Sequence, residues 1–273
     1  MASIISLTTD FGLSDPYVAA VKGSILTLNP DATIVDISHG IPPQDLERGA
    51  FVLACALPYF PAGSIHIAVV DPGVGSERLA LAVSTPAGVF IGPDNGILSP
   101  AFPDTARDAV EGRGAVAVSL PAVIRAFALS DSRFHRVPVS PTFHTRDIFA
   151  PVAARVSLGV PPSELGPEVK EVTALPPFRA EVGDDGAVRG RVIHLDRFGN
   201  LITTVRADQL RGPDVEVEIA GRVIAGLTRT YADSARLTAL VGSCGFLEIA
   251  FSGGSAETEL GAQAGDAVVV RRR

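Results

Sequence analysis

The sequence predicts an α/β N-terminal domain, with a central mixed or parallel sheet flanked by helices, and a small all-β, barrel-like C-terminal domain. In the first part of the chain, short runs rich in β-branched residues alternate with segments of helical apolar spacing, as in a sheet covered on both faces. From Phe178 onward, short strand patterns are separated by turn signals such as Gly183 to Gly186, which favours a sandwich or barrel. Prolines between Pro161 and Pro177 indicate a linker, and we place the domains at residues 1–172 and 173–273.

The elements of the first domain follow from local signals. An apolar strand ends in T-T-D-F-G, and Asp15-Pro16 is a favourable start for the next helix, because Asp caps helices and Pro fits their first turn. The expected elements are a strand at 3–8, a helix at 16–28, a strand at 33–37, a helix at 44–57, strands at 65–70, 79–84 and 89–91, an extended stretch at 137–141 and a helix at 148–158.

The second domain has shorter elements. Strands are expected at residues 187–195, 201–205, 215–219, 237–241, 246–251 and 267–270. The segment D-R-F-G-N, Asp196 to Asn200, connects the first two of these strands and has the composition of a hairpin turn.

Composition excludes several classes of protein. Hydrophobic residues make up 47% of the chain and charged residues 19%, which allows a large core and argues against disorder. The net charge is −7 and the basic run is confined to Arg271 to Arg273, so we expect no nucleic acid as a partner. Cys55 and Cys244 lie among apolar residues and are expected to be buried thiols.

We also expect no membrane attachment. The N-terminal segment lacks a basic leader and a long apolar core, which argues against a signal peptide. The longest stretch without Asp, Glu, Lys or Arg, residues 49–70, is broken by Pro58, Pro61 and Gly63 and is interpreted as helix, turn and strand. A cytoplasmic location is therefore expected.

The most informative stretch is S-I-H-I-A-V-V-D-P-G-V-G-S-E-R, from Ser64 to Arg78. A buried strand ends at Asp71, Pro72-Gly73 then favours a turn, and Gly75 lets the backbone approach another segment closely. Arg78 follows just before the next apolar run. A carboxylate and a guanidinium are thus expected at the mouth of two adjoining strands, where α/β proteins bind ligands. A turn-capping Asp with a surface Arg would leave the same pattern.

Other polar residues interrupt apolar elements, and each also has a purely structural interpretation. Asp10 follows the first strand and could cap a helix. His144, in T-F-H-T-R-D, could belong to a capping network, and Asn200 could be a hairpin residue. Ser243 lies in V-G-S-C-G-F-L-E-I-A and is unremarkable alone. Their chemistry becomes specific when they are taken together.

Taken in order, these segments resemble the S-adenosyl-L-methionine hydroxide adenosyltransferases, the water-using relatives of the fluorinase and chlorinase. The matching motifs are L-T-T-D-F-G at Asp10, V-D-P-G-V-G-S-x-R at Asp71 to Arg78, G-P-D-N-G from Gly92, T-F-H-x-R-D-I-F-A-P at His144, D-R-F-G-N from Asp196 and G-F-L-E-I-A from Gly245. Co-linear motifs over nearly the whole chain are far more specific than any one of them.

The resemblance implies a fold and a reaction. The α/β domain would precede a β-barrel, and a homotrimer would place active sites at the interfaces between the N-terminal domain of one subunit and the C-terminal domain of its neighbour. The reaction would be hydrolysis of S-adenosyl-L-methionine, with the R sulfonium epimer as one candidate, by attack of water at the ribose C5′. The products would be adenosine and L-methionine. The sulfonium leaves as a neutral thioether and needs no acid, and no metal or other cofactor is implied.

The Asp-Arg-His triad of the family falls on Asp71, Arg78 and His144. Our hypothesis is that these residues hold one water in line with C5′ and favour its hydroxide-like form. Arg78 would stabilise developing negative charge, and Asp71, beside a positive charge that favours its ionised form, would orient the water. His144, as a side chain that titrates near neutral pH, would accept the proton. The sequence leaves open which of the three takes it.

The resemblance also implies the substrate-binding residues. Asp10 would accept hydrogen bonds from the ribose hydroxyls, and Asp196 would face the methionine ammonium. Asn200 would hold the adenine edge, with Phe198 packing on the ring. Ser243 would contact the methionine carboxylate.

Two positions depart from the halogenating relatives. Cys244 stands where they carry an Arg, so the methionine carboxylate must be recognised differently here. Asp71 stands where they carry an uncharged residue, and a carboxylate there would repel a halide. The second departure favours hydrolysis.

Three alternatives are weighed against this interpretation. A calcium-dependent ribonucleoside hydrolase also begins with a strand ending in T-D-x-G, but the close Asp pair of its calcium site is missing after Gly12. A halogenase conflicts with Asp71. A non-catalytic trimeric nucleoside-binding protein would keep Asp10 and Asn200 without needing the triad. Calcium dependence, halide dependence, and adenosine binding without turnover would identify these three in turn.

Overall fold

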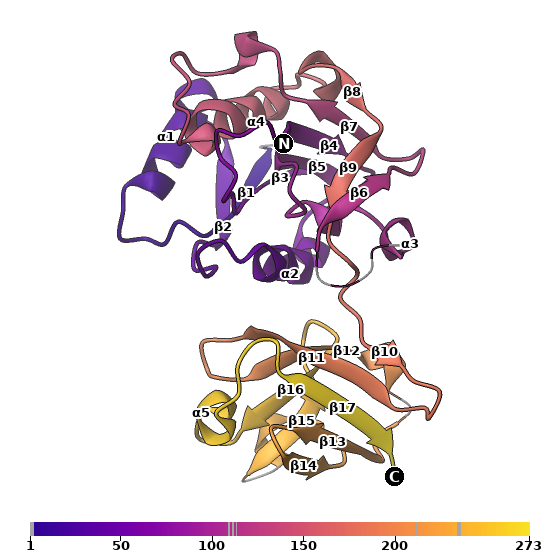
Figure 1. Ribbon diagram of the computed structural model, residues 1–273. Helices are drawn as coiled ribbons and strands as arrows, with labels where there is room; N and C mark the ends of the chain where they lie inside the picture. The colour runs from indigo at the N-terminus through magenta and orange to yellow at the C-terminus, as the bar shows by residue number, and fades with distance from the viewer. Residues whose placement is uncertain (1–2, 109, 111, 113, 211, 234–235) are drawn as a thin grey trace. The chain divides into compact units, whose positions relative to one another are not determined.

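The computed structural model describes residues 3–108, 110, 112, 114–210, 212–233 and 236–273. The chain forms two compact units, one ending at Pro177 and the other running from Phe178 to Arg273, each built on a sheet of its own (Figure 1). The boundary expected after residue 172 falls inside strand β9 (Glu171–Ala174). Since β9 pairs with β6 (Val116–Ser119), this strand belongs to the first unit.

The first unit contains a mixed sheet in the order β2-β1-β3-β5-β4-β7-β8. Its parallel strands are β1 (Ile4–Thr9), β2 (Thr33–Ser38), β3 (Ser64–Val69) and β5 (Gly88–Pro93). The strands β4 (Ala80–Ser84), β7 (Arg125–Ala128) and β8 (Glu168–Val169) run antiparallel to their neighbours. The expected mixed sheet is confirmed.

Helices cover both faces of this sheet (Figure 1). The helices α1 (Tyr17–Leu28) and α4 (Ala150–Ser157) pack together on one face, and α2 (Leu46–Ala56) lies on the other. Ile25 of α1 and Val152 of α4 join Ile67 of the sheet in one buried cluster. A short helix, α3 (Asp104–Arg107), precedes β6.

The segment between residues 116 and 174 departs most from the expectations. It contains β6, β7, β8 and β9, which the sequence patterns do not predict, and β8 and β9 lie in the proline-rich stretch expected to be a linker. These strands are two to four residues long, too short for a local alternation to stand out. The expected extended stretch at 137–141 forms no strand, and the helix expected from 148 begins earlier, as a π-helical turn (Thr145–Phe149) that leads into α4.

The second unit is an antiparallel sheet in the order β14-β13-β17-β11-β12-β16-β15, with β10 beside β11. The edge strands β14 and β15 contact each other, so the sheet curls into a nearly closed barrel, as expected. Its core includes Val192, Leu201 and Ile249. The elements are β10 (Glu181–Val182), β11 (Val188–Leu195), β12 (Leu201–Arg206), β13 (Val215–Ile219), β14 (Arg222–Ala225), β15 (Leu237–Val241), β16 (Phe246–Phe251), α5 (Ala256–Leu260) and β17 (Ala267–Arg272).

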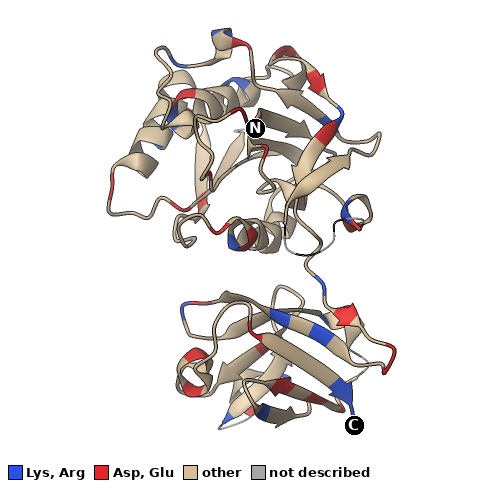
Figure 2. Ribbon diagram, viewed as in Figure 1, with Lys and Arg blue, Asp and Glu red and all other residues tan. Residues whose placement is uncertain are grey.

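The cysteines differ from the expectation of two buried thiols. Cys55 on α2 is half-buried, and Cys244 is exposed, because it lies in the turn between β15 and β16 rather than in a strand. Acidic and basic side chains are interspersed in both units (Figure 2). Within the described residues, no helix combines the length and the apolar character needed to cross a membrane.

Candidate functional site

In the first unit, the carboxyl ends of the parallel strands carry the polar residues that the sequence singles out. Thr9 of β1 lies opposite Val69 of β3, so Asp10 and Asp71 leave the sheet at the same edge. The strands that flank Asp71 and Arg78 were expected to adjoin, and this is wrong, because β5 lies between β3, which ends before Asp71, and β4, which begins after Arg78. The two residues are instead joined by the loop 70–79.

The segment after β5 holds both ends of this loop. The Asn95 side-chain amide donates to the Val70 carbonyl at 2.8 Å, and the backbone N–H of Asp94 donates to the Leu79 carbonyl at 2.9 Å. Because these anchors lie directly before Asp71 and directly after Arg78, they bring the carboxylate and the guanidinium back to one place.

The middle of the loop is fixed by a tight turn and by a second segment. The Ser76 hydroxyl donates to the Gly73 carbonyl at 2.7 Å. Gly75 has a φ of +81°, and a Cβ there would lie 2.6 Å from the Pro141 carbonyl oxygen. Glycine is thus required both by the backbone conformation and by space, as the sequence predicts. The segment that approaches it is the one that leads to His144.

Asp71 and Arg78 form a two-pronged ion pair. The Arg78 Nε donates to Asp71 Oδ1 at 2.8 Å and its Nη2 donates to Oδ2, the parallel arrangement typical of strong Arg–carboxylate pairs. The Arg78 and Asp71 side chains are 9% and 7% exposed respectively. The guanidinium also lies 5.7 Å from the centre of the Phe149 ring. Arg78 is therefore no free surface residue.

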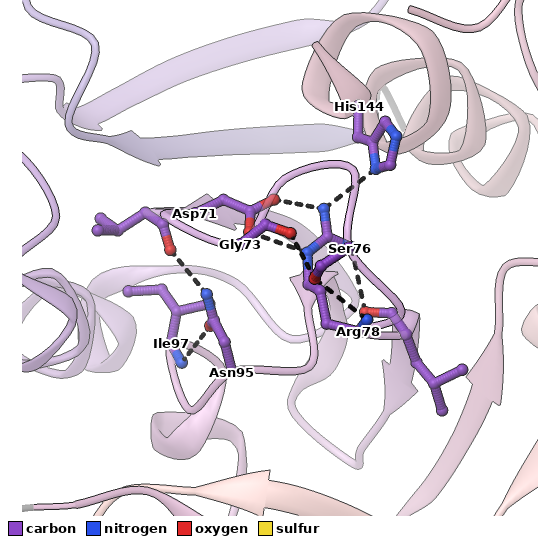
Figure 3. A network of polar contacts seen from close by, with 9 residues as sticks. Asp71, Gly73, Ser76, Arg78, Asn95, Ile97 and His144 are labelled. Carbon is purple, nitrogen blue, oxygen red and sulfur yellow. Dashed lines mark hydrogen bonds and ion pairs between the residues drawn. The ribbon is translucent and has the colours of Figure 1, made fainter. Parts of the chain in front are cut away.

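Arg78 also binds His144, so its guanidinium lies between the carboxylate and the imidazole (Figure 3). Its Nη2 is 3.1 Å from His144 Nδ1. Since a guanidinium has only donors, Nδ1 must accept, and the neutral ring then carries its proton on Nε2. Burial lowers the pKa of His144, and the positive charge of Arg78 lowers it further. Both effects favour the neutral ring at pH 7.

His144 is held by its neighbours rather than by a capping bond of its own. It precedes the π-helical turn and makes no side-chain cap. The adjacent Phe143 packs edge-to-face on Phe11 and Tyr17, at centroid distances of 5.9 and 5.3 Å. The fully buried Asp147 accepts from Ser140 N at 2.9 Å and is ion-paired with Arg146, so the segment on either side of His144 is tied down.

Asp10 is oriented by the turn that precedes α2. Its Oδ2 accepts a hydrogen bond from the Gln44 backbone N–H at 2.9 Å. Gln44 has a φ of +66°, a conformation that costs a non-glycine residue energy. Asp10 does not cap α1, whose N-cap residue is Pro16. The other carboxylate oxygen of Asp10, Oδ1, accepts no hydrogen bond from the described residues.

In the second unit, Asp196 and Asn200 close the hairpin between β11 and β12. Asp196 Oδ1 accepts from the backbone N–H groups of Phe198 and Asn200 at 2.8 and 2.9 Å, and its Oδ2 accepts from the Asn200 side chain at 2.9 Å. The hairpin interpretation of Asn200 is thus correct, and its side chain is buried. Phe198 at the hairpin is 78% exposed, an unusual position for an aromatic ring without a ligand or partner.

Ser243 lies at the β15–β16 turn. The turn is closed by the Gly242 N–H, which donates to the Phe246 carbonyl at 2.9 Å, and both Ser243 and the neighbouring Cys244 are exposed. The structure thus brings Asp71, Arg78 and His144 together in the first unit, and presents the Asp196–Asn200 hairpin and Ser243 in the second.

Models of two family domains match this chain. The S-adenosylmethionine hydroxide adenosyltransferase N-terminal domain matches residues 5–166, and the C-terminal domain of the same family matches residues 190–269. Together they cover most of the chain. The protein belongs to the S-adenosylmethionine hydroxide adenosyltransferase family.

Individual relatives agree with this membership. The chain is 40% identical over 267 residues to the (R)-S-adenosyl-L-methionine hydrolase of Thermus thermophilus, covering 94% of this chain and 95% of the relative. A fluorinase from an Actinoplanes species is more distant, at 24% identity over 90% of each chain. A crystal structure of an uncharacterised conserved protein from Thermotoga maritima superposes with a TM-score of 0.85 at 30% identity, covering 98% of this chain and 100% of that one.

Several residues that contact or lie near the candidate site residues are absent from the sequence-based expectations. Asn95 anchors the loop of Asp71 and Arg78. Its position in the motif G-P-D-N-G is a signal by which it could have been found in the sequence. The buried Glu248 accepts a hydrogen bond from the exposed Tyr231 at 2.6 Å and lies near Asp196. The available signal was a single acidic residue in the apolar strand F-L-E-I-A-F, but nothing local identifies its partner.

Proposed function

We propose that this protein hydrolyses S-adenosyl-L-methionine at the ribose C5′ and releases adenosine and L-methionine. The observation that carries the proposal is the Asp71–Arg78–His144 contact at the edge of the sheet, in a chain of the hydroxide adenosyltransferase family. The R sulfonium epimer is the proposed substrate, after the name of the Thermus thermophilus relative.

The reaction needs an activated water rather than an acid. The water oxygen attacks C5′, the C5′–S bond breaks, and its electron pair leaves with sulfur as a neutral thioether. One proton of the water must be accepted. A positioned base contributes roughly 10²–10⁴-fold to such a step, and alignment of the water with the C5′–S bond contributes further.

The contacts of His144 favour Asp71 as the proton acceptor, in place of our initial hypothesis that His144 takes the proton. With Nδ1 occupied by Arg78, the remaining nitrogen of a neutral His144 is a donor. This N–H group of His144 is suited to donating a hydrogen bond to the oxygen of the water and so orienting it. Each Asp71 oxygen accepts one bond from Arg78 and retains acceptor capacity. Arg78 would stabilise the negative charge that develops on the attacking water.

The remaining site residues have binding roles in the proposal. Asp10, with Oδ1 uncommitted, would accept from the ribose hydroxyls, and the exposed Phe198 ring would pack on adenine beside Asn200. Asp196 would face the methionine ammonium and Ser243 the carboxylate. We further propose a cytoplasmic homotrimer whose active sites lie at subunit interfaces, acting without metal or other cofactor.

Turnover in ¹⁸O-labelled water tests the proposal. Attack at C5′ places one ¹⁸O atom in the 5′-hydroxyl of adenosine and none in methionine, as mass spectrometry of the products would show. Free adenine would indicate cleavage of the glycosidic bond, as in a ribonucleoside hydrolase. Bound adenosine without any product would indicate a binding protein. Light scattering after gel filtration tests the trimer separately.

A further inference from the structure

The loop that carries Asp10 is held by a buried pair of polar side chains. Thr9, the last residue of β1, is 1% exposed, and its hydroxyl lies 2.7 Å from Nδ1 of His39, which is 6% exposed. The Thr9 hydroxyl oxygen also accepts a hydrogen bond from the Phe11 backbone N–H at 3.3 Å. The His39 carbonyl oxygen accepts one from the Gly12 backbone N–H at 2.8 Å. Thr9 and His39 therefore hold the backbone that follows Asp10.

A bulge in β2 brings His39 to the end of β1. In the parallel pairing of these strands, Leu7 lies opposite Asp36, whereas the next residue, Thr8, lies opposite Ser38. Strand β2 thus carries one extra residue at this point. Bulges redirect side chains and are frequent next to active sites. His39 directly follows β2, so the bulge advances this residue to the level of the last residue of β1.

Asp36 determines which nitrogen of His39 carries the proton. Burial raises the pKa of Asp36, but Lys22 and His39 outweigh burial and hold that pKa below its ordinary value. His39 Nε2 lies 3.2 Å from Asp36 Oδ1. Because an ionised carboxylate only accepts, Nε2 carries the proton, and Nδ1 of the neutral ring then accepts from the Thr9 hydroxyl. Asp36 therefore keeps the imidazole in the tautomer that Thr9 requires.

We propose that His39 is a positioning residue for Asp10, and that through Thr9 it sets the preference of the site for ribose over 2′-deoxyribose. The inference rests on the proposed function, in which Asp10 accepts hydrogen bonds from the ribose hydroxyls, and it deepens that function. The Gln44 backbone N–H holds only one Asp10 oxygen, Oδ2, at 2.9 Å. The direction of Oδ1 then depends on the backbone of the loop, and a small shift there would misalign its hydrogen bonds to the sugar.

The test compares the binding of adenosine and 2′-deoxyadenosine. Thr9→Val keeps the shape of the side chain but removes the hydroxyl, whereas Thr9→Ser retains the hydroxyl. Thr8→Val is the matched control, because Thr8 is also fully buried but its hydroxyl has no hydrogen-bond partner among the described residues. Calorimetric titration measures Kd for both nucleosides, and thermal unfolding measures the stability of each variant.

Thr9→Val should weaken adenosine binding by about two- to tenfold, the scale of one neutral hydrogen bond. The binding of 2′-deoxyadenosine should weaken less, so the preference of the wild-type protein for adenosine should fall. Thr9→Ser should restore that preference, and Thr8→Val should leave it unchanged. His39→Phe, which removes both ring nitrogens, should act like Thr9→Val. In turnover, Thr9→Val and His39→Phe should raise KM for S-adenosylmethionine with little change in kcat.

A double variant separates positioning of Asp10 from a general structural effect. In the Asp10→Ala background, Thr9→Val should cause no further loss of adenosine affinity, because its effect passes through the missing carboxylate. An additive loss would overturn the inference. So would a wild-type protein without any preference for adenosine, or variants that weaken both nucleosides equally or neither of them.

Two features keep these outcomes distinct. Both nucleosides are titrated into the same preparation, so partial unfolding of a variant changes the number of binding sites and not the ratio of the two Kd values. Failure of the proposed function is also recognised separately. A wild-type protein that prefers adenosine to 2′-deoxyadenosine, and loses that preference in Thr9→Val, but makes no adenosine from S-adenosylmethionine would refute the proposed function and support the role of His39.

Discussion

Arg78 donates to Nδ1 of His144 across 3.1 Å, from the same Nη2 that binds Asp71. One guanidinium therefore both orients the acid and selects the tautomer of the imidazole. Arg78 is itself positioned by a loop whose ends are held after β5. All three residues of the triad lie in the first unit of the chain, and the course of the chain through its sheet brings them together.

Removal of the proposed base should abolish most activity. We expect Asp71→Asn to lower kcat by roughly 10²–10⁴-fold, the usual contribution of a general base, with adenosine affinity little changed. His144→Ala should lower kcat by two or more orders of magnitude on the same scale. Glu77→Gln is the control, because Glu77 is an exposed acid of the same loop. Near wild-type turnover in either triad variant would remove that residue from the mechanism.

The lowered pKa of His144 predicts how activity depends on pH. Burial and Arg78 hold this pKa below the ordinary value of 6.5. The neutral ring therefore persists as the pH falls through 6.5, and kcat should not decline with His144 until the pH drops below its lowered pKa. A pH–rate profile measures this. An acid limb centred at or above 6.5 that disappears in His144→Ala would contradict the assignment.

Asp10 should matter for binding rather than for the chemical step. We expect Asp10→Ala to weaken adenosine binding by about tenfold or more, because it removes a charged acceptor for the ribose hydroxyls. Asp15→Ala, at an exposed position in the following segment, should bind normally. Calorimetric titration with adenosine provides both values, and an unchanged affinity in Asp10→Ala would refute the ribose assignment.

Gly75 offers a test of the loop itself. Gly75→Ala should lower the free energy of unfolding by about 1–3 kcal/mol from the positive φ alone, and should also push the loop away from Pro141. Gly63→Ala is a matched control, since Gly63 has a φ of +84° and open space at its Cβ position. Denaturation and activity are compared in both. If the two variants lose activity equally at equal folded fraction, the Pro141 contact does not position the triad.

Local patterns were sufficient for part of the fold and site. Asp71 and Arg78 flank a short Gly- and Pro-containing loop, so their proximity was predictable, as was the close approach at Gly75. Long apolar runs correctly predicted the central strands. The order of these strands in the sheet was not predictable from the order of the runs along the sequence, because β5 lies between β3 and β4.

The remaining features depend on tertiary contacts that leave no local pattern. Arg78 and His144 are 66 residues apart in the chain. Within the sequence, only the family resemblance places them in one site. Glu248 is buried and accepts a hydrogen bond from Tyr231, which lies 17 residues before it in a segment with no periodic signal. Cys244 was expected to be buried because its neighbours are apolar, but those neighbours form the strands on either side of a turn.

The most direct measurement is chromatography of EDTA-treated protein incubated with a mixture of S-adenosylmethionine sulfonium epimers in halide-free buffer. The account predicts that adenosine and methionine appear in equal amounts, that the R epimer is consumed first, and that added Ca²⁺ changes nothing. Activity that returns only with Ca²⁺ or halide, or bound adenosine without any products, would contradict it.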